Sequence, residues 1–342
     1  MRAMSTRTAI FGASGFVGGE LLRICAAHPE LEPVRLFADS QAGKKASDVH
    51  PHLALAYPSL RLETYSAELL DGIELVFAAL PHGHSQKIAS EIISRGIAFV
   101  DLGADFRLRD PATYENWYHE PHAAPELLDL FVYGIPEIDR ETIRSSRCVA
   151  AAGCYPTAAI LALKPLIDAG LVKPQGIVVD AASGVSGAGR VLKEETAFPA
   201  VAESMSAYGL VSHRHTAEME ATLGASLVFT PHLAPMNRGI LATCYAEAVA
   251  PMAVHAPLET LREAYAGEPF VVVAERPPAT KWTLGSNAVH ITARHDARTG
   301  RVIAVAALDN LVKGAAGQMI QCANLMLGFH ESAGLTSCGV YP

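Results

Sequence analysis

The sequence predicts an α/β protein of two domains, a doubly wound parallel sheet followed by a second α+β domain. The chain has 342 residues, which is more than one hydrophobic core usually serves. Its first half alternates short apolar runs with helical patterns, which is typical of a parallel sheet. After about Lys173, strand-like runs follow one another with few helices between them. That pattern indicates a mostly antiparallel sheet with helices on one face.

The elements of the first half follow from its short apolar runs. The first helix is expected to contain Gly18–Ala27, directly after the first strand. Strands are expected at Thr8–Phe11, Pro33–Ala38, Ile73–Ala78, Ile97–Leu102 and Cys148–Ala151.

The second half is expected to be built mainly of strands. The last apolar segment, Val312–Leu327, has helical periodicity and ends at Gly328, a usual helix stop. The strands are expected at Ile177–Ala181, Ser226–Phe229, Ile240–Val249, Phe270–Val273, Val289–Ala293 and Val302–Ala307.

Composition excludes several classes of protein. Half of the residues are apolar and 18% are charged, which is a dense globular composition. The formal charge of −8 leaves no basic surplus for a nucleic-acid partner. No long apolar run could span a membrane, and Met1–Thr8 lacks the apolar core of a secretory signal. Six cysteines without paired spacing favour reduced thiols in a cytoplasmic enzyme.

A glycine-rich loop lies between the first strand and the first helix. Gly12, Gly15 and Gly18 give the spacing G-x-x-G-x-x-G. Glycines here permit a tight turn, let a pyrophosphate approach the backbone and place it at the positive end of a helix. An ordinary tight turn is the alternative, but the position after the first strand favours a Rossmann-type dinucleotide site.

The loop after the second strand bears on which dinucleotide binds. Asp39 stands where an acid would hydrogen-bond the ribose of NAD. The polar and basic run from Ser40 to Lys45, which includes Lys44, suits a 2′-phosphate instead. The lysines could also be a solvated loop. The sequence therefore favours NADP (as NADPH) and leaves NAD open.

Cys154 stands apart from the other five cysteines. It follows Gly153 at the end of a strand and precedes Pro156 and a helical run, so its thiol is expected at a helix N-terminus. That location favours the nucleophilic thiolate. A lone cysteine is more often a small buried apolar residue, but this context favours a nucleophile. With a nicotinamide, such a thiol could carry an acyl group that hydride then reduces to an aldehyde.

Nine motifs in order give the sequence a family resemblance from about residue 7 to 330. It resembles the N-acetyl-γ-glutamyl-phosphate reductases, relatives of aspartate-semialdehyde dehydrogenase. The motifs are Gly12–Gly18, Pro81–Gly83, Asp101–Leu108, Tyr133–Glu137, Gly153–Thr157, Ser183–Arg190, His213–His215, Phe229–Leu233 and Asp309–Gly314.

The resemblance implies a role for particular residues. Cys154 would be the acylated nucleophile and His215 the acid/base, with His213 as the second candidate. Substrate contacts would come from Arg107, which would hold the phosphate, and from Arg214 and Glu218; a salt bridge to Asp105 or Asp110 is the other interpretation of Arg107. The expected site needs no metal. The cofactor contacts implied are Gly12, Ser14, Gly15, Phe16, Val17, Ser40, Lys44, Pro81, Ser183, Gly184, Gly187 and Asn310.

The resemblance also implies the architecture. Residues 1–153 with 312–342 would form the dinucleotide-binding domain. Residues 154–311 would form a substrate and oligomerisation domain of the type found at the C-terminus of glyceraldehyde-3-phosphate dehydrogenase, in a homodimer or homotetramer. One departure stands beside the nucleophile, because the family usually has Asn-Pro where this chain has Ala151-Ala152.

The reaction implied is the NADPH-dependent reduction of N-acetyl-γ-glutamyl phosphate, a small molecule of arginine biosynthesis, to the semialdehyde and phosphate. Two alternatives stay open. One is the same chemistry on an aminoadipyl phosphate borne by an acidic carrier protein in lysine biosynthesis, which the charge of −8 disfavours. The other is a non-catalytic NADP-sensing protein, which would not need Cys154, Arg107 and His215 together.

Overall fold

The structure is a computed structural model that describes residues 5–342. The described chain divides into two compact units. Unit 1 comprises the residues up to Ala152 together with Ala315–Leu335, and unit 2 comprises Gly153–Gly314 with Thr336–Pro342. The interpretation of Met1–Thr8 as no secretory signal falls partly outside the described residues.

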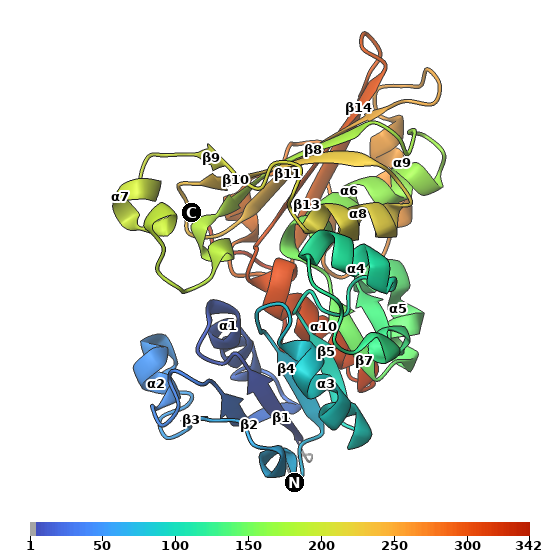
Figure 1. The fold of residues 1–342 in the computed structure, drawn as a ribbon. Coiled ribbons are helices and arrows are strands. Elements are labelled where there is room, and N and C mark those ends of the chain that lie inside the picture. The colour runs from blue at the N-terminus through green and yellow to red at the C-terminus, as the bar shows by residue number, and fades with distance from the viewer. Residues whose placement is uncertain (1–4) are drawn as a thin grey trace. The chain divides into compact units, whose positions relative to one another are not determined.

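Unit 1 is built on a parallel sheet with the strand order β3-β2-β1-β4-β5-β7-β6 (Figure 1). Its strands are β1 (Thr6–Phe11), β2 (Leu31–Phe37), β3 (Leu62–Glu63), β4 (Leu75–Ala78), β5 (Ala98–Asp101), β6 (Phe131–Gly134) and β7 (Cys148–Ala151). Its α-helices are α1 (Phe16–Cys25), α2 (Ala46–Val49), α3 (Ser85–Ser94), α4 (Pro111–Tyr118), α5 (Pro136–Ser145) and α10 (Gly317–Met326). Chain order reverses between the neighbouring strands β1 and β4, and a dinucleotide usually binds outside the carboxyl ends of the strands at such a point.

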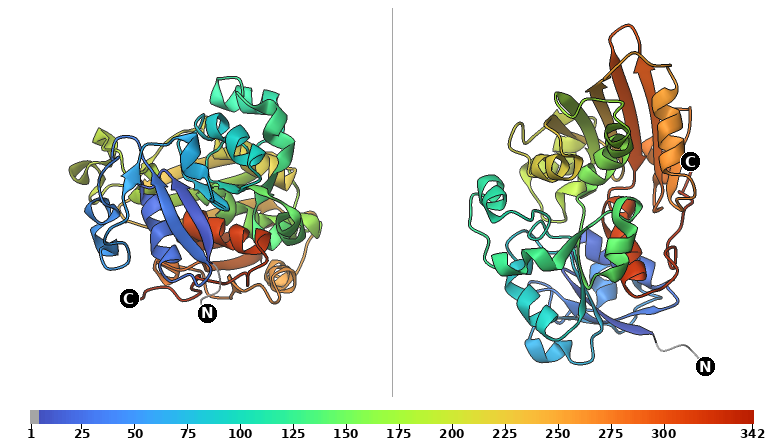
Figure 2. Two further views of the ribbon diagram at one scale, coloured as in Figure 1. Left: turned by 90° about the horizontal axis from the view of Figure 1, so that it is seen from below. Right: turned by 90° about the vertical axis from the view of Figure 1, so that its right-hand side faces the viewer.

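Helices cover both faces of this sheet, as the doubly wound prediction requires. In β7, Val149 packs with Cys322 of α10 and Ile143 of α5. Its neighbours Cys148 and Ala150 point to the opposite face, where Ile92 of α3 lies. Helix α1 lies beside α10 (Figure 2).

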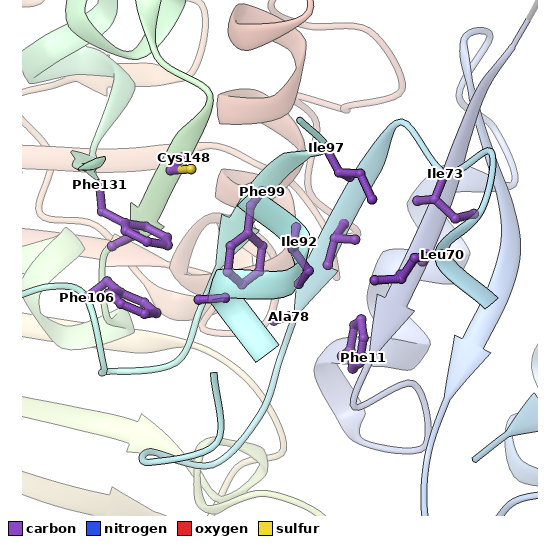
Figure 3. Close-up of a cluster of buried hydrophobic side chains, with 14 of the residues drawn as sticks. Phe11, Leu70, Ile73, Ala78, Ile92, Ile97, Phe99, Phe106, Phe131 and Cys148 are labelled. Carbon is purple, nitrogen blue, oxygen red and sulfur yellow. The ribbon is translucent and has the colours of Figure 1, made fainter. Parts of the chain in front are cut away.

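The core on the α3 face is rich in aromatic rings (Figure 3). Phe106 stacks on Phe131 with ring centroids 3.9 Å apart, and Phe99 meets Phe131 edge-on at 5.6 Å. Such pairs contribute roughly 0.5–1.5 kcal/mol each beyond the area they bury. Phe106 directly precedes Arg107 in the chain, so this packing fixes the backbone beside the predicted phosphate contact.

Unit 2 contains a mixed sheet with the strand order β12-β13-β14-β11-β8-β10-β9 (Figure 1). Its strands are β8 (Ile177–Gly184), β9 (Ser206–Ala207), β10 (Leu227–Ala234), β11 (Ile240–Glu247), β12 (Val271–Val273), β13 (Val289–Asp296) and β14 (Arg301–Leu308). Within the described part of this second sheet, only β8 with β10 and β12 with β13 pair in parallel. The predicted mostly antiparallel sheet is therefore confirmed.

Three helices pack on this sheet: α6 (Cys154–Asp168) on β11 and β14, α8 (His215–Leu223) on β10, and α9 (Ala256–Ala264) on β13. Burial alternates along β11, where Ala242 and Cys244 are buried and Leu241 and Thr243 are only partly buried. That period of two shows that helices cover one face of the sheet. The short helix α7 (Phe198–Val201) lies in the long connection from β8 to α8.

Some sequence-derived boundaries need correction. Strand β6 was missed, because its four residues directly follow an apolar 3₁₀ turn at Pro125–Leu130 and the two merge into one run. The last helix is not uniform: Val312–Ala316 forms a π-turn before α10. Helix α10 ends at Met326, and Gly328, with φ 72°, follows its C-cap Leu327, consistent with the expected glycine stop. The tail 336–342 belongs to unit 2 and not to the dinucleotide domain, because Thr336 O accepts from Asn287 N at 2.8 Å.

Among residues 5–342, no helix is long and apolar enough to cross a lipid bilayer.

Candidate active site and cofactor-binding loops

The glycine-rich loop of unit 1 has the close packing that a dinucleotide site needs. Gly12 has φ 73°, and an added Cβ there would lie 2.2 Å from Ala79 O, in the loop after β4. An added Cβ on Gly18 would lie 2.5 Å from Gly12 O. At Gly15, in contrast, it would meet only Gly12 O, at 3.3 Å. The backbone at Gly15 is therefore the open point, and a Cβ there would fill the space a pyrophosphate would take.

Helix α1 begins directly after this loop. Its N-cap, Gly15, makes no side-chain cap, and the first turn has no acidic residue. The first N–H groups of a helix lack partners within the helix and attract anions. Ser14, Phe16 and Val17, expected cofactor contacts, lie at this helix start. The loop, including Pro81 beyond Ala79, fits a dinucleotide phosphate on its geometry.

The predicted 2′-phosphate loop is fixed in shape by β3. Gly43 N donates to Leu62 O at 2.7 Å, and Leu62 N donates to Lys44 O at 2.9 Å. The Arg61 guanidinium donates to Gly43 O at 2.7 Å. Ser40, Lys44 and Arg61 are all exposed, so a second cation that the sequence did not single out lies beside the loop.

The sequence analysis missed His50. Its ring is 4% exposed, and Nε2 lies 2.8 Å from Ala13 O in the glycine-rich loop. The same ring fills the space beside Gly19, where an added Cβ would lie 2.7 Å from it. His50 therefore braces the loop from behind, and only its place in the run His50-Pro51-His52 could have drawn notice.

Arg107 lies in a tight segment that leaves the end of β5. Its Nη2 donates to Leu102 O at 2.7 Å. The two carboxylates considered as its partners accept from backbone groups: Asp105 from Gly83 N and Gln86 N, and Asp110 from Ala112 N and Thr113 N at the start of α4.

Cys154 is the first residue of α6, as the sequence predicted. The helix has Gly153 as its N-cap, with no side-chain cap, so the helix dipole favours a thiolate there. The thiol is partly exposed. An added Cβ on Gly314 would lie 2.8 Å from Cys154 Cβ, so the glycine of the Asp309–Gly314 motif is needed for close packing beside Cys154.

Two buried alanines, Ala151 and Ala152, precede Gly153 and Cys154. Ala151 ends β7 opposite Gly134, and Ala152 O accepts from Gln318 Nε2 at 3.3 Å. Both alanines are 0% exposed. The polypeptide before Cys154 is thus held by backbone pairing and by Gln318 in unit 1.

The two candidate histidines surround Tyr155, the neighbour of Cys154. Ring centroids of Tyr155 lie 5.8 Å from His213 and 5.9 Å from His215, and the histidine rings are 4.8 Å apart. His213 Nδ1 accepts from His215 N at 3.2 Å. Burial and then the charge of Arg214 lower the pKa of His213 to about 4. His213 is therefore neutral at pH 7.

Tyr208 joins this cluster and had no sequence signal, since it is a lone tyrosine in an irregular connection. Its hydroxyl donates to Tyr155 Oη at 3.1 Å, and Tyr155 donates to His232 O at 3.0 Å. Burial raises the pKa of Tyr208 to about 12, and the charge of Cys154 contributes to the same shift. The tyrosine pair therefore lies close enough to the thiol to sense its charge, and both hydroxyls stay protonated.

Glu218 lies on the first turn of α8 and is 3% exposed. Its Oε1 accepts from Gly153 N at 2.6 Å, so this carboxylate holds the peptide directly before Cys154. The resemblance implied a substrate contact for Glu218. The geometry adds a positioning role, because helix α8 thereby ties His215 to the start of α6. Arg214, which stands between the two histidines in the sequence, is partly buried.

The expected nicotinamide loop is organised around Asn310. Asn310 Oδ1 accepts from Gly239 N at 2.8 Å, and Nδ2 donates to Ser186 Oγ at 3.0 Å. An added Cβ on Gly187 would lie 3.0 Å from Ser183 Oγ. At Gly184 it would lie 2.7 Å from Asn237 O. The structure thus brings together the expected contacts Ser183, Gly184, Gly187 and Asn310.

Two family models match the chain. The NAD binding domain of semialdehyde dehydrogenases matches residues 7–146, and their dimerisation domain matches residues 154–310. Among solved structures, aspartate semialdehyde dehydrogenase II from Vibrio cholerae, complexed with ASA, has a TM-score of 0.71 at 18% identity. It covers 95% of this chain and 99% of its own. An aspartate semialdehyde dehydrogenase with NADP from Candida albicans has a TM-score of 0.65 at 15% identity, covering 94% and 98%.

Curated relatives are far more similar in sequence. The N-acetyl-γ-glutamyl-phosphate reductase of Pelotomaculum thermopropionicum is 46% identical, over 99% of this chain and 100% of its own length. The reductase of the same name from Symbiobacterium thermophilum is 47% identical over the same shares, and that from Paracoccus denitrificans 45%. The two halves match the two semialdehyde dehydrogenase domains, and the chain as a whole belongs to the N-acetyl-γ-glutamyl-phosphate reductase family.

Proposed function

We propose that this protein reduces N-acetyl-γ-glutamyl phosphate to N-acetylglutamate semialdehyde and phosphate with NADPH, in arginine biosynthesis. Family membership over the full length supports the substrate. The observation that carries the chemistry is Cys154 at the start of α6, beside a cluster of His213, His215 and two tyrosines.

The proposed reaction begins with transfer of the Cys154 proton to His215. The sulfur then bonds to the acyl carbon, the carbon–oxygen bond to phosphate breaks, and the phosphate leaves with the proton from His215. Arg107 would hold this phosphate, since a guanidinium matches its oxygens. A bound nicotinamide dinucleotide supplies the hydride that reduces the thioester. The resulting hemithioacetal oxyanion expels the Cys154 thiolate, and the aldehyde departs.

Local geometry supports the remaining roles. Glu218 would fix the Gly153 peptide so that the Cys154 sulfur faces the substrate, and Arg214 would bind a substrate carboxylate. Gly12, Ser14, Gly15, Phe16, Val17 and Pro81 would hold the pyrophosphate region, and Ser183, Gly184, Gly187 and Asn310 the nicotinamide region.

A substrate screen separates this proposal from its rivals. In the reverse, phosphate-dependent direction, acetylglutamate semialdehyde should give a higher kcat/KM than aspartate or aminoadipate semialdehyde. A higher kcat/KM for aminoadipate semialdehyde would instead assign the protein to lysine biosynthesis. No turnover with any of the three, despite NADP binding, would favour the non-catalytic sensor.

The cofactor is proposed to be NADPH, because Ser40 and Lys44 are exposed on the loop expected to meet the 2′-phosphate and the exposed Arg61 donates to Gly43 O of that loop. We expect kcat/KM to be higher with NADPH than with NADH. Lys44→Ala should lower the NADPH value by about tenfold, the loss of one charge-assisted hydrogen bond. The NADH value of the same variant is the matched control and should not change. A wild-type preference for NADH would refute the assignment.

The match to a dimerisation domain supports self-association, and we propose a homodimer or homotetramer. Large apolar side chains are exposed along one segment of unit 2, and a second copy of the chain would cover them. They are Val191, Leu192, Phe198, Met205, Leu210 and Val211. A single-subunit mass by light scattering would contradict this proposal. We also propose that the protein acts in the cytoplasm.

A further inference from the structure

The segment that leaves β5 contains two buried carboxyl groups and one guanidinium. Asp101 and Asp105 are both 0% exposed, and Arg107 follows them in the same turn. Asp101 Oδ1 accepts from Ser85 Oγ at 2.6 Å and from Gly103 N at 2.9 Å. An added Cβ on Gly103 would lie 3.0 Å from Asp101 Oδ1, so the turn closes tightly around this carboxyl.

The two carboxyl groups differ in the hydrogen bonds that their oxygens accept. Asp105 receives one backbone donor on each oxygen, Gly83 N at 2.6 Å on Oδ1 and Gln86 N at 3.1 Å on Oδ2. Both donors lie at or directly before the start of α3. Asp101 Oδ2 is buried, and no donor within residues 5–342 hydrogen-bonds to it. A buried oxygen without a donor is better tolerated in a neutral carboxylic acid than in a carboxylate.

The charges around Asp101 come from its own turn. The pKa of Asp101 is raised to about 7, mainly by burial and also by the Asp105 carboxylate, while Ser85, Gly103 and the Arg107 charge oppose that rise. Strand β4 and helix α10, which pack on β5, contain no charged residue. Helix α3 also packs on β5 and bears Lys87 and Glu91, but neither is among the causes of the Asp101 shift. On β7, burial raises the pKa of the Cys148 thiol to about 11, so it is neutral. Arg107 is thus the one cation among the groups that shift this pKa, and its charge favours the Asp101 carboxylate.

We propose that Asp101 takes up a proton when a phosphate-class dianion binds at Arg107, so that binding of the leaving group and protonation of this carboxyl are coupled. This inference rests on the proposed role of Arg107. A dianion at Arg107 cancels the positive field that stabilises the Asp101 carboxylate and adds negative charge nearby. Both effects favour the neutral acid.

The sign of the pH effect follows from this coupling. Below about pH 7 Asp101 is already neutral, so an anion at Arg107 meets no negative charge on Asp101. Above that pH Asp101 is ionised and must gain a proton for the anion to bind. Anion affinity should therefore fall as the pH rises from 6 to 9, with a slope of up to tenfold per pH unit for one coupled proton.

Sulfate is the suitable probe, because it is a tetrahedral dianion that does not titrate in this range. Calorimetry on the full-length protein, in two buffers of different ionisation enthalpy, measures both the sulfate affinity and the protons taken up. In the wild type we expect uptake approaching one proton near pH 8 and a dissociation constant at least tenfold larger at pH 9 than at pH 6. Asp101→Asn should abolish this uptake and flatten the pH dependence.

Ser85→Ala provides a second test that does not remove the carboxyl. It deletes a donor that stabilises the Asp101 carboxylate, so the pH window of proton uptake should move upward. A merely structural role of Asp101 would change the affinity without moving this window. Proton uptake that persists in Asp101→Asn, or a window unmoved in Ser85→Ala, would overturn the coupling.

Variants of Arg107 test the underlying phosphate site separately. Arg107→Lys should weaken sulfate roughly ten- to a hundredfold, because an ammonium cannot make the paired contact of a guanidinium. If Arg107→Lys binds sulfate as tightly as the wild type, the phosphate role of Arg107 fails. If sulfate needs Arg107 but binds without proton uptake, only the coupling fails.

Discussion

Cys154→Ser is expected to abolish acyl-phosphate reduction, with kcat lower by on the order of 10⁴-fold or more. The proposed route requires a thiolate that bonds to the acyl carbon and later leaves, and a serine hydroxyl does neither at neutral pH. NADPH binding and thermal stability should stay close to wild type, because the side chain is partly exposed and shrinks by little. Steady-state rates, a cofactor titration and a thermal melt measure the three quantities.

Selective alkylation checks the same residue without a mutation. Burial raises the pKa of Cys25 and Cys244 to about 12 and that of Cys148 to about 11, so these thiols should react slowly with iodoacetamide. Cys338 is exposed and gives the rate of an ordinary surface thiol. Cys154 should be labelled faster than Cys338 at pH 7, and prior incubation with the acyl phosphate should protect it. An unreactive Cys154, or an active serine variant, would leave the sensor as the better hypothesis.

His215→Asn is expected to lower kcat/KM by roughly 10²–10⁴-fold, the usual contribution of an acid/base group. His213 is the less suitable acid because its pKa is lowered to about 4 by burial and by Arg214. It therefore stays neutral above about pH 4 and does not titrate between pH 5 and 9. An acid limb of the kcat/KM profile within that range cannot come from His213, and His215→Asn should remove it.

His213→Asn is the matched control, because an asparagine oxygen replaces the Nδ1 that accepts from His215 N. Its loss should be about tenfold or less, and the acid limb should remain. A larger loss in His213→Asn than in His215→Asn would exchange the two roles.

The local elements around the site could be predicted from the sequence because their signals are local. A glycine at position 12 after a strand, or Gly153 and Pro156 around a cysteine, constrains backbone angles within a few residues. The structure accordingly has the loop at Gly12–Gly18 and a helix that begins at Cys154. The order of strand and helix patterns along the chain is also a local signal, and it predicted the parallel sheet of the first half and the mostly antiparallel sheet of the second. Strand β6 was not predicted, because no turn residue separates it from the apolar 3₁₀ turn before it.

Only the tertiary structure decided which groups share one environment. Nothing in the spacing of Glu218 or Tyr208 shows that one holds Gly153 N and the other adjoins the thiol. The sequence likewise left His213 and His215 open, whereas the structure buries His213 among aromatic rings and so keeps it neutral. Asp101 is an ordinary acid in the sequence, and its pKa is raised to about 7 mainly because the fold removes water from it. Burial and charge neighbours depend on packing between distant segments, and desolvation acts only once that packing exists.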